Sequence, residues 1–147
     1  MRVLLTGMSG TGKSTILAML AERGFRVVDT DERGWKVRDA DEWIWDEERM
    51  SALLTSAEER LFVSGCVPNQ GRFYDRFDAI VLLSAPADVI LKRIATRTSN
   101  PYGKNEADRA AILADLAAVE PRLRATCTHE LDAIVDALVA IAREPRR

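Results

Sequence analysis

The residues best suited to chemistry lie near the start of the chain, in the segment Gly7–Ser14, which reads GMSGTGKS. This segment satisfies the pattern G-x-x-x-x-G-K-[ST] at every fixed position. Its glycines let the backbone wrap closely around a phosphate group, and the N–H groups that begin a following helix attract the negative charge. The ammonium of Lys13 can reach the terminal phosphates of a nucleotide, and the hydroxyl of Ser14 can bind Mg²⁺. The segment therefore predicts a binding site for a nucleoside triphosphate.

A second chemical feature is the acidic pair Asp29 and Asp31, which follows the strand expected at 25–28. Side chains of an extended segment repeat every two residues, so both carboxylates are expected on the same side. At the carboxyl end of a parallel strand, one carboxylate can hold Mg²⁺ and the other can accept a proton from an attacking hydroxyl. Because the strands expected at 61–64 and 79–83 end without an acid, the metal-side carboxylate must come from this pair. The alternative interpretation is a solvated turn.

The elements that position these residues follow from apolar runs that alternate with stretches of helical periodicity. Strands are expected at 3–6, 25–28, 61–64, 79–83 and 128–131. Helices are expected at 13–23, 39–54, 106–119 and 133–142, with one more beginning at Pro86. Strands interleaved with helices predict one α/β domain, with a three-layer α/β/α arrangement around a five-stranded parallel sheet. Spacing alone leaves the order of the strands open.

Composition limits the class of protein. The chain has 147 residues, one domain's worth, and its 21 Lys and Arg against 23 Asp and Glu give a net charge of −2 and a pI near 5.5. Broad binding of duplex nucleic acid is therefore not expected, because such domains have a pI above roughly 9. No apolar run approaches the ~18 residues of a membrane helix, so no membrane span is expected. Cys66 and Cys127 lie far apart without a CxxC motif, and we expect reduced thiols in a cytoplasmic protein.

The segment Gly7–Ser14 resembles the Walker A motif of P-loop NTPases. With the Asp29–Asp31 segment and with Gly65 at the end of the third expected strand, the chain is similar to small-molecule kinases related to shikimate kinase and gluconate kinase. These belong to the adenylate kinase-like group, and an AAA-type ATP-binding domain is expected. The resemblance spans nearly the whole chain. It implies a P-loop NTPase fold with strand order 2-3-1-4-5, Asp29 on the metal side and Asp31 facing the acceptor hydroxyl.

Arg93 and Arg97 lie four residues apart and precede the segment 98–105, which is rich in turn-forming residues and is expected to be a short lid loop. In the related kinases, arginines of such a lid clamp ATP and neutralise charge on the transferred phosphoryl group. The resemblance implies this role for Arg97 and nucleotide contact for Arg93. The shikimate kinase family has Arg-Pro where this chain has Asn100-Pro101. A solvated helix end is the alternative.

About residues 32–60 occupy the place of the acceptor-binding region in that group. Aromatic faces and cations in this region can stack on or bind an acceptor, or the tryptophans can form core instead. The residues concerned are Arg33, Trp35, Lys36, Arg38, Trp43, Trp45 and Arg49. The cations indicate an anionic acceptor, although acidic residues surround them. The residues expected to bind the acceptor are Asp31, Arg33, Gly65, Asn69, Gln70 and Arg72.

Together these features predict a single kinase-like domain over residues 1–147 that uses ATP and Mg²⁺ to phosphorylate a small-molecule acceptor, with a hydroxyl-bearing metabolite favoured. The alternatives are a nucleoside monophosphate kinase, a non-catalytic ATP-binding switch, and a slow NTPase in which Gln70 would orient water. Catalytic roles are expected for Lys13, Asp31 and Arg97, and Mg²⁺ ligation for Ser14 and Asp29. The residues expected to bind the nucleotide are Gly7, Ser9, Gly10, Thr11, Gly12, Lys13, Ser14, Thr15, Arg93 and Arg97.

Overall fold

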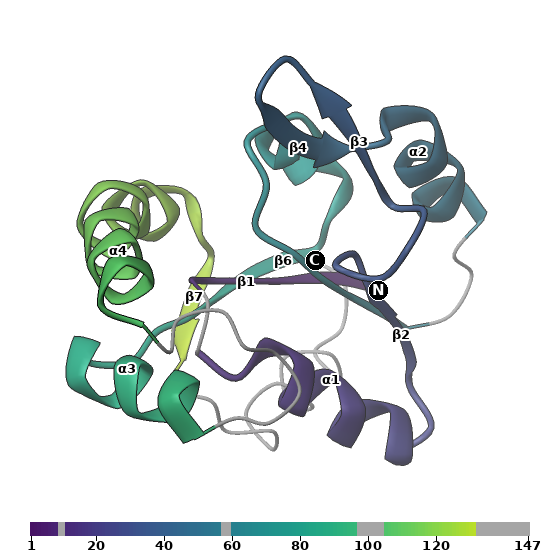
Figure 1. The fold of residues 1–147 in the computed structure, drawn as a ribbon. Helices are drawn as coiled ribbons and strands as arrows, with labels where there is room; N and C mark the ends of the chain where they lie inside the picture. The colour runs from purple at the N-terminus through teal and green to yellow at the C-terminus, as the bar shows by residue number, and fades with distance from the viewer. Residues whose placement is uncertain (9–10, 57–59, 97–104, 132–147) are drawn as a thin grey trace.

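The structure is a computed structural model that describes residues 1–8, 11–56, 60–96 and 105–131, arranged as in Figure 1. The loop expected at 98–105, apart from Asn105, and the helix expected at 133–142 lie outside the described residues. In chain order the elements, with η1 a 3₁₀-helix, are β1 (Arg2–Thr6), α1 (Lys13–Glu22), β2 (Arg26–Asp29), β3 (Lys36–Asp39), β4 (Glu42–Trp45), α2 (Glu47–Ser56), β5 (Leu61–Ser64), η1 (Gln70–Arg76), β6 (Ala79–Leu83), α3 (Ala87–Thr96), α4 (Glu106–Thr126) and β7 (His129–Leu131).

One parallel sheet contains five of these strands, in the order β2-β5-β1-β6-β7. The bounds of β5 and β6 are those expected, 61–64 and 79–83. All of β6 and the first three residues of β5 are apolar, and the fold buries every residue of both strands. The observed order differs from the expected order 2-3-1-4-5 in its numbering. The reason is that the sequence did not predict β3 and β4, which lie between β2 and β5 in the chain. The parallel arrangement brings the carboxyl ends of β1, β2 and β5 to one edge.

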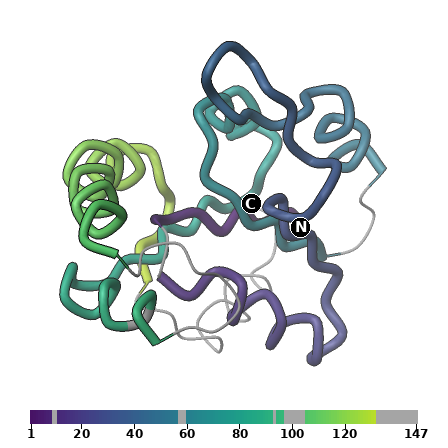
Figure 2. The backbone as a smooth tube through the Cα atoms, viewed as in Figure 1, coloured from purple at the N-terminus to yellow at the C-terminus, as the bar shows by residue number. Residues whose placement is uncertain are grey.

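Both faces of the sheet are covered, and the alternation of side chains along β1 shows how. Val3 and Leu5 belong to one buried cluster together with residues of α1, whereas Leu4 belongs to another with Trp45 of β4 and Met50 of α2. Figures 1 and 2 show α1 on one side of the sheet, and α2, η1 and the β3–β4 hairpin on the other. Two separate clusters of buried residues, one on each face of the sheet, therefore hold β1 in place and position the loop that follows it at the sheet edge.

The helix expected at 39–54 is wrong in its first half. There, β3 and β4 form an antiparallel hairpin, and Ala40 in its turn has a φ of 52°. The sequence of β4, EWIW, has aromatic and β-branched side chains, and the fold buries Trp45 completely. The pairing of the two strands and the burial of Trp45 thus outweigh the helical pattern that predicted a helix here. α2 begins after the hairpin, where Asp46 Oδ1 accepts a hydrogen bond from the N–H of Arg49 at 3.1 Å.

α4 is longer than the helix expected at 106–119, and it continues through Pro121. Side chains of its last turns are held by ion pairs, because Arg124 lies 2.8 Å from Glu120 and 2.9 Å from Glu130 of β7. A proline lacks one backbone donor and weakens a helix interior. The helix nevertheless continues to Thr126, and Leu123, two residues after the proline, is buried.

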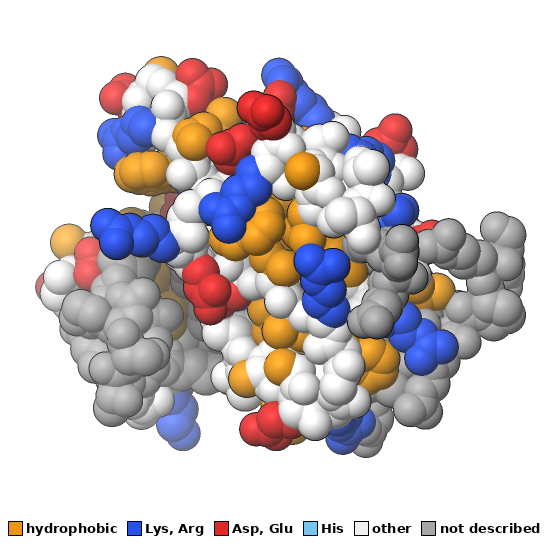
Figure 3. Space-filling model, turned by 90° about the vertical axis from the view of Figure 1, so that its right-hand side faces the viewer, with side chains coloured by type: hydrophobic (Ala, Val, Ile, Leu, Met, Phe, Trp, Pro, Cys, Tyr) orange, Lys and Arg blue, Asp and Glu red, His pale blue; other side chains and the backbone are white. Residues whose placement is uncertain are grey.

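Charged side chains of both signs are interspersed on the face shown in Figure 3, in keeping with the net charge of −2. A face of this kind does not build the single-sign field that attracts a polyanion over a wide area. In the part of the chain that the structure describes, no helix is long and apolar enough to cross a membrane.

Candidate functional site

The phosphate loop joins β1 to α1, as its motif requires. The ammonium of Lys13 donates hydrogen bonds to the carbonyl oxygens of Gly7 and of Met8, the latter at 3.1 Å. The hydroxyl of Thr11 donates to the same Met8 oxygen at 2.8 Å, and Thr11 is fully buried. These bonds fold the Lys13 side chain back across the loop, which keeps its charge beside the backbone that would surround a phosphate group.

Two glycines of this loop occupy positions that a residue with a side chain would not tolerate well. Gly7 has a φ of 150°, and a Cβ at this position would lie 2.5 Å from the carbonyl oxygen of Leu83. Gly12, which precedes α1, has a φ of 96°, in the left-handed region that side chains disfavour. Ser9 and Gly10 lie outside the described residues, so their role in phosphate binding stays a prediction.

The electrostatic environment of Lys13 favours an anion. Burial lowers the pKa of Lys13, and the nearby Cys66, Asp31 and Asp29 oppose that shift. Both carboxylates of the predicted pair therefore lie within electrostatic reach of the lysine. A buried ammonium is costly unless negative charge compensates it. A phosphate group placed beside the loop would supply that charge.

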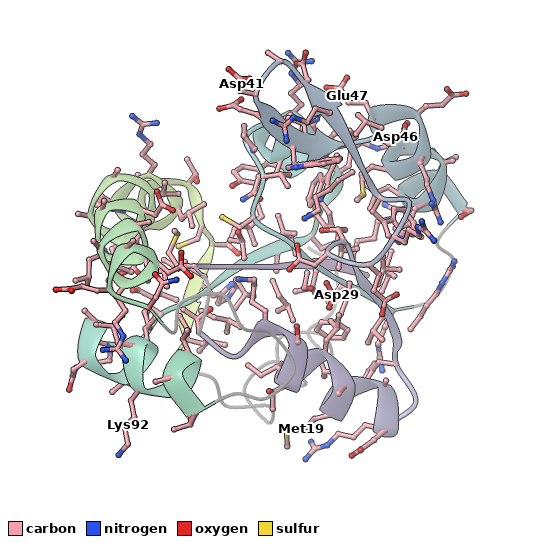
Figure 4. The ribbon with its side chains drawn as sticks, in the orientation of Figure 1. Met19, Asp29, Asp41, Asp46, Glu47 and Lys92 are labelled. Carbon is pink, nitrogen blue, oxygen red and sulfur yellow. The ribbon has the colours of Figure 1, made fainter. Side chains whose placement is uncertain are left out.

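Asp29 closes β2, and several donors hold its carboxylate. Oδ2 accepts a hydrogen bond from Ser14 Oγ at 3.3 Å, and Oδ1 accepts from the N–H of Asp31 at 2.9 Å and from Ser64 Oγ at 3.4 Å. Figure 4 shows Asp29 between the sheet and α1. A hydroxyl and a carboxylate are hard oxygen donors of the kind that Mg²⁺ prefers. Ser14 and Asp29 therefore fit the pair of Mg²⁺ ligands that the sequence predicts. Thr15, the next predicted nucleotide residue, is exposed on α1.

Asp31 forms an ion pair with Lys36 of β3, in which Nζ lies 2.9 Å from Oδ1. The Asp31 side chain is 64% exposed and that of Lys36 is 27% exposed. The carboxylate expected to face an acceptor is thus open to solvent, but one of its oxygens is bound by a cation. The five-residue separation of the two gave no sign of this pairing, because it depends on the unpredicted hairpin.

Trp45 anchors the hairpin to the sheet. Its Nε1 donates to Thr30 Oγ1 at 2.9 Å, and the hydroxyl of Thr30 donates in turn to the carbonyl oxygen of Ser64 at 2.7 Å. Gly65 permits this contact, since a Cβ there would lie 2.4 Å from Thr30 Oγ1 and 3.0 Å from the Trp45 ring. Of the two tryptophans of β4, Trp45 is therefore core, whereas Trp43 is 53% exposed.

Two of the residues predicted to bind the acceptor, Asn69 and Arg72, instead form hydrogen bonds or ion pairs with other residues of the protein. Asn69 binds the backbone of Trp45 twice, accepting from its N–H at 3.0 Å and donating to its carbonyl oxygen at 3.1 Å. Arg72 forms an exposed ion pair with Glu47 at 2.7 Å. Both residues therefore connect η1 and the turn before it to the hairpin and α2. Arg33, a third predicted residue, is exposed shortly after Asp31.

Gln70 is buried, and its side-chain amide is fully engaged. Its Oε1 accepts from the N–H of Val67 at 3.0 Å, and its Nε2 donates to Thr6 Oγ1 at 3.1 Å and to the Tyr74 hydroxyl at 2.9 Å. Since Thr6 directly precedes the phosphate loop, Gln70 supports the end of β1. Sequence reasoning missed this role because a polar residue in a turn is usually exposed.

The cations and tryptophans of the acceptor region pair with each other. Arg49 lies 4.1 Å from the centre of the Trp35 ring, and Arg38 lies 5.5 Å from that of Trp43. The stacking that the sequence suggested for an acceptor is thus present within the chain. Of the two predicted arginines near the lid, the Arg93 backbone lies in α3, while its side chain and Arg97 fall outside the described residues.

A family model described as AAA domain matches residues 3–114, the span that contains the phosphate loop and both aspartates. Comparison with curated proteins gives no significant match.

Solved structures of small-molecule kinases share the fold. Shikimate kinase from Acinetobacter baumannii, in complex with shikimate, has a TM-score of 0.63 and 18% identity, over 95% of this chain and 91% of that one. Shikimate kinase from Bacteroides thetaiotaomicron gives 0.63 and 19%, over 95% and 94%. A gluconokinase from Sinorhizobium meliloti 1021 gives 0.54 and 19%, over 96% and 88%. These likenesses confirm the expected resemblance in fold.

Proposed function

The chain belongs to the AAA domain family, and on that premise we propose that it is a P-loop kinase that transfers the γ-phosphoryl group of ATP to a hydroxyl-bearing small molecule. One observation carries the proposal. At the carboxyl edge of β1 and β2, Ser14 lies 3.3 Å from Asp29, and Lys13 lies within electrostatic reach of Asp29 and Asp31. The fold shared with shikimate kinase and gluconokinase supports an acceptor of small size.

In this proposal the nucleotide lies against the loop from Gly7 to Ser14. Backbone N–H groups and the start of α1 receive its phosphates, and Lys13 exchanges its bonds to the loop carbonyls for phosphate oxygens. Ser14 and Asp29 would hold Mg²⁺, which when bound neutralises charge on the phosphates. The oxygens of Asp29 are held by backbone and hydroxyl donors, so this carboxylate is oriented before any ligand arrives.

Transfer requires a hydroxyl aligned with the γ-phosphorus. Asp31 orients that hydroxyl and accepts its proton as the acceptor oxygen forms a bond to the γ-phosphorus. The bond from that phosphorus to the β,γ-bridging oxygen breaks, and ADP leaves with the electron pair. Arg97 would stabilise the charge of the transferred group, with Arg93 at the nucleotide. Residues 1–147 act as one kinase-like domain in this proposal, in which about residues 32–60 form the acceptor side.

The contacts of Gln70 argue against the slow-NTPase alternative. Its amide is bound on both ends by Val67, Thr6 and Tyr74, and only 3% of the residue is exposed, so it is poorly placed to orient an attacking water.

An assay of ADP release from MgATP, run over a panel of hydroxyl-bearing metabolites, tests the proposal. At least one acceptor should raise turnover well above basal hydrolysis, and Asp31→Asn should lower that acceptor-dependent rate about 10²- to 10⁴-fold while leaving ATP binding intact. If no acceptor raises turnover and ATP still binds, the chain is a nucleotide-binding module rather than a kinase.

A further inference from the structure

The Lys36–Asp31 ion pair occupies the carboxylate to which the proposed function gives the acceptor proton. Nζ of Lys36 lies 2.9 Å from Asp31 Oδ1, and both side chains reach solvent. Exposed ion pairs contribute little to stability and exchange readily. An oxygen that already accepts a hydrogen bond from an ammonium is less available to accept one from an incoming hydroxyl. The acceptor must therefore displace Lys36 or provide it with another partner.

The position of Lys36 is fixed by the hairpin. It lies directly opposite Trp45 in the β3–β4 register, so the two side chains project from the same face. Trp45 is tied to Thr30, the residue before Asp31, by the 2.9 Å bond from Nε1 to Oγ1. A second bond at the hairpin base runs from the N–H of Asp46 to the carbonyl oxygen of Trp35 at 2.8 Å. Lys36 is thereby held beside the end of β2, where only its flexible side chain has freedom to move.

Further positive charge continues along the same hairpin face. Arg38 lies two residues beyond Lys36 and opposite Trp43, whose ring it covers at 5.5 Å. Starting from Asp31, this face thus presents an ammonium and then a guanidinium on an exposed aromatic ring. The ammonium of Lys36 and the guanidinium of Arg38 are together suited to bind a ligand that carries negative charge on the side away from its reacting hydroxyl.

We propose, building on the proposed function, that Lys36 is a specificity-determining residue that selects acceptors carrying a carboxylate or phosphate group as well as the reacting hydroxyl. The anionic group of the acceptor takes the Lys36 ammonium, and the same exchange releases Asp31 Oδ1 for the hydroxyl. A neutral acceptor offers Lys36 no such partner, so Asp31 stays bound. The charge of the acceptor and the availability of the base are in this way coupled through one side chain.

The test compares Lys36→Met and Lys36→Arg with the unaltered protein on matched neutral, carboxylate and phosphate forms of polyols, sugars and nucleosides, for example glycerol, glycerate and glycerol 3-phosphate. Lys92→Met is the matched control, because Lys92 is exposed on α3, away from Asp29 in Figure 4. Initial rates give KM and kcat for each acceptor. Calorimetry measures acceptor binding to the protein saturated with MgADP, a readout that does not need transfer.

For anionic acceptors, Lys36→Met should raise KM and the dissociation constant roughly 10- to 100-fold, the usual effect of losing one charged hydrogen bond. Lys36→Arg should restore most of the binding, and the KM for ATP should be unchanged. With neutral acceptors, Lys36→Met should raise kcat/KM, because the substitution frees Asp31 Oδ1. Binding that depends on Lys36 without transfer would support the inference and overturn the kinase proposal. Transfer without preference for charge, or an equal loss on neutral and anionic acceptors, would overturn the inference alone. Neither binding nor transfer across the panel would overturn both.

Discussion

The hydroxyl of Ser14 lies 3.3 Å from Oδ2 of Asp29 and so joins the first turn of α1 to the end of β2. Ser14 comes from the phosphate loop, and Asp29 comes from a strand that reaches the same edge through the parallel sheet. Two oxygen donors of different elements are thus brought to the place where a metal on the nucleotide phosphates is proposed.

Asp29→Asn should separate metal binding from nucleotide binding. With Mg²⁺ present, the affinity for ATP should fall roughly 10- to 100-fold because one proposed metal ligand is lost. In EDTA the affinity should stay the same or improve, because the substitution removes a negative charge near the triphosphate. Isothermal titration calorimetry under both conditions measures this. The combination with Ser14→Ala should cost less than the product of the single losses, since the two side chains act on one ion. Equal weakening in EDTA would contradict the assignment.

Lys13 should leave a signature in the pH dependence of stability. Burial lowers the pKa of Lys13 in the folded chain below the ordinary value of 10.5, which the unfolded chain keeps. At pH values between the lowered pKa and 10.5, the unfolded chain therefore binds up to one more proton than the folded chain. The free energy of unfolding should therefore rise with pH across this window in the unaltered protein, relative to Lys13→Met, which lacks the group. Urea unfolding of both proteins at several pH values between 7 and 10.5 measures the difference. A difference that falls as pH rises would show that the folded chain stabilises the charged form.

Trp45→Phe should loosen the hairpin. The change removes the donor to Thr30 Oγ1 and part of a fully buried ring, and we expect a loss of about 1–3 kcal/mol in the free energy of unfolding. Because the hairpin holds Lys36, the KM for the acceptor should rise while that for ATP changes little. Trp43→Phe is the control, with a change within about 0.5 kcal/mol at this half-exposed site. Similar losses for both variants in urea titrations would show that the indole–threonine bond has no special part in anchoring the hairpin.

Gly65→Ala and Gly71→Ala form a matched pair of glycine substitutions. A methyl group at position 65 would meet Thr30 Oγ1 at 2.4 Å and the Trp45 ring at 3.0 Å, whereas nothing lies within 4 Å of a Cβ at position 71. We expect Gly65→Ala to destabilise the fold by about 1–3 kcal/mol through overpacking. Gly71→Ala should be neutral or slightly stabilising. Thermal unfolding of both variants provides the comparison. An unchanged melting temperature for Gly65→Ala would show that Thr30 and Trp45 are not packed tightly against Gly65.

Much of the fold follows from local pattern. The bounds of β5 and β6 could be predicted because β6 is a continuous apolar run and β5 is apolar up to its last residue, Ser64, and burial on both faces imposes no competing period. The loop motif identifies Ser14 locally. The acidic pair at the end of β2 left Asp29 and Asp31 both open as the metal-side carboxylate, and only the resemblance to shikimate kinase and gluconate kinase implied Asp29.

The acceptor side could not be read in the same way. The hairpin depends on the long-range contact of Trp45 with Thr30 and on the space left at Gly65, which no local period encodes. Asn69 and Gln70 looked like ligand-binding residues because they are polar and lie in a turn. Their partners are backbone and side-chain groups that only the folded chain brings near.

The most direct test of the account is phosphorus-31 NMR of the protein with MgATP and a hydroxyl-bearing, negatively charged acceptor. We predict a new phosphate monoester resonance that grows in step with ADP and is absent for Lys13→Met and for reactions without acceptor. Inorganic phosphate as the sole product alongside ADP, with every acceptor tried, would contradict it.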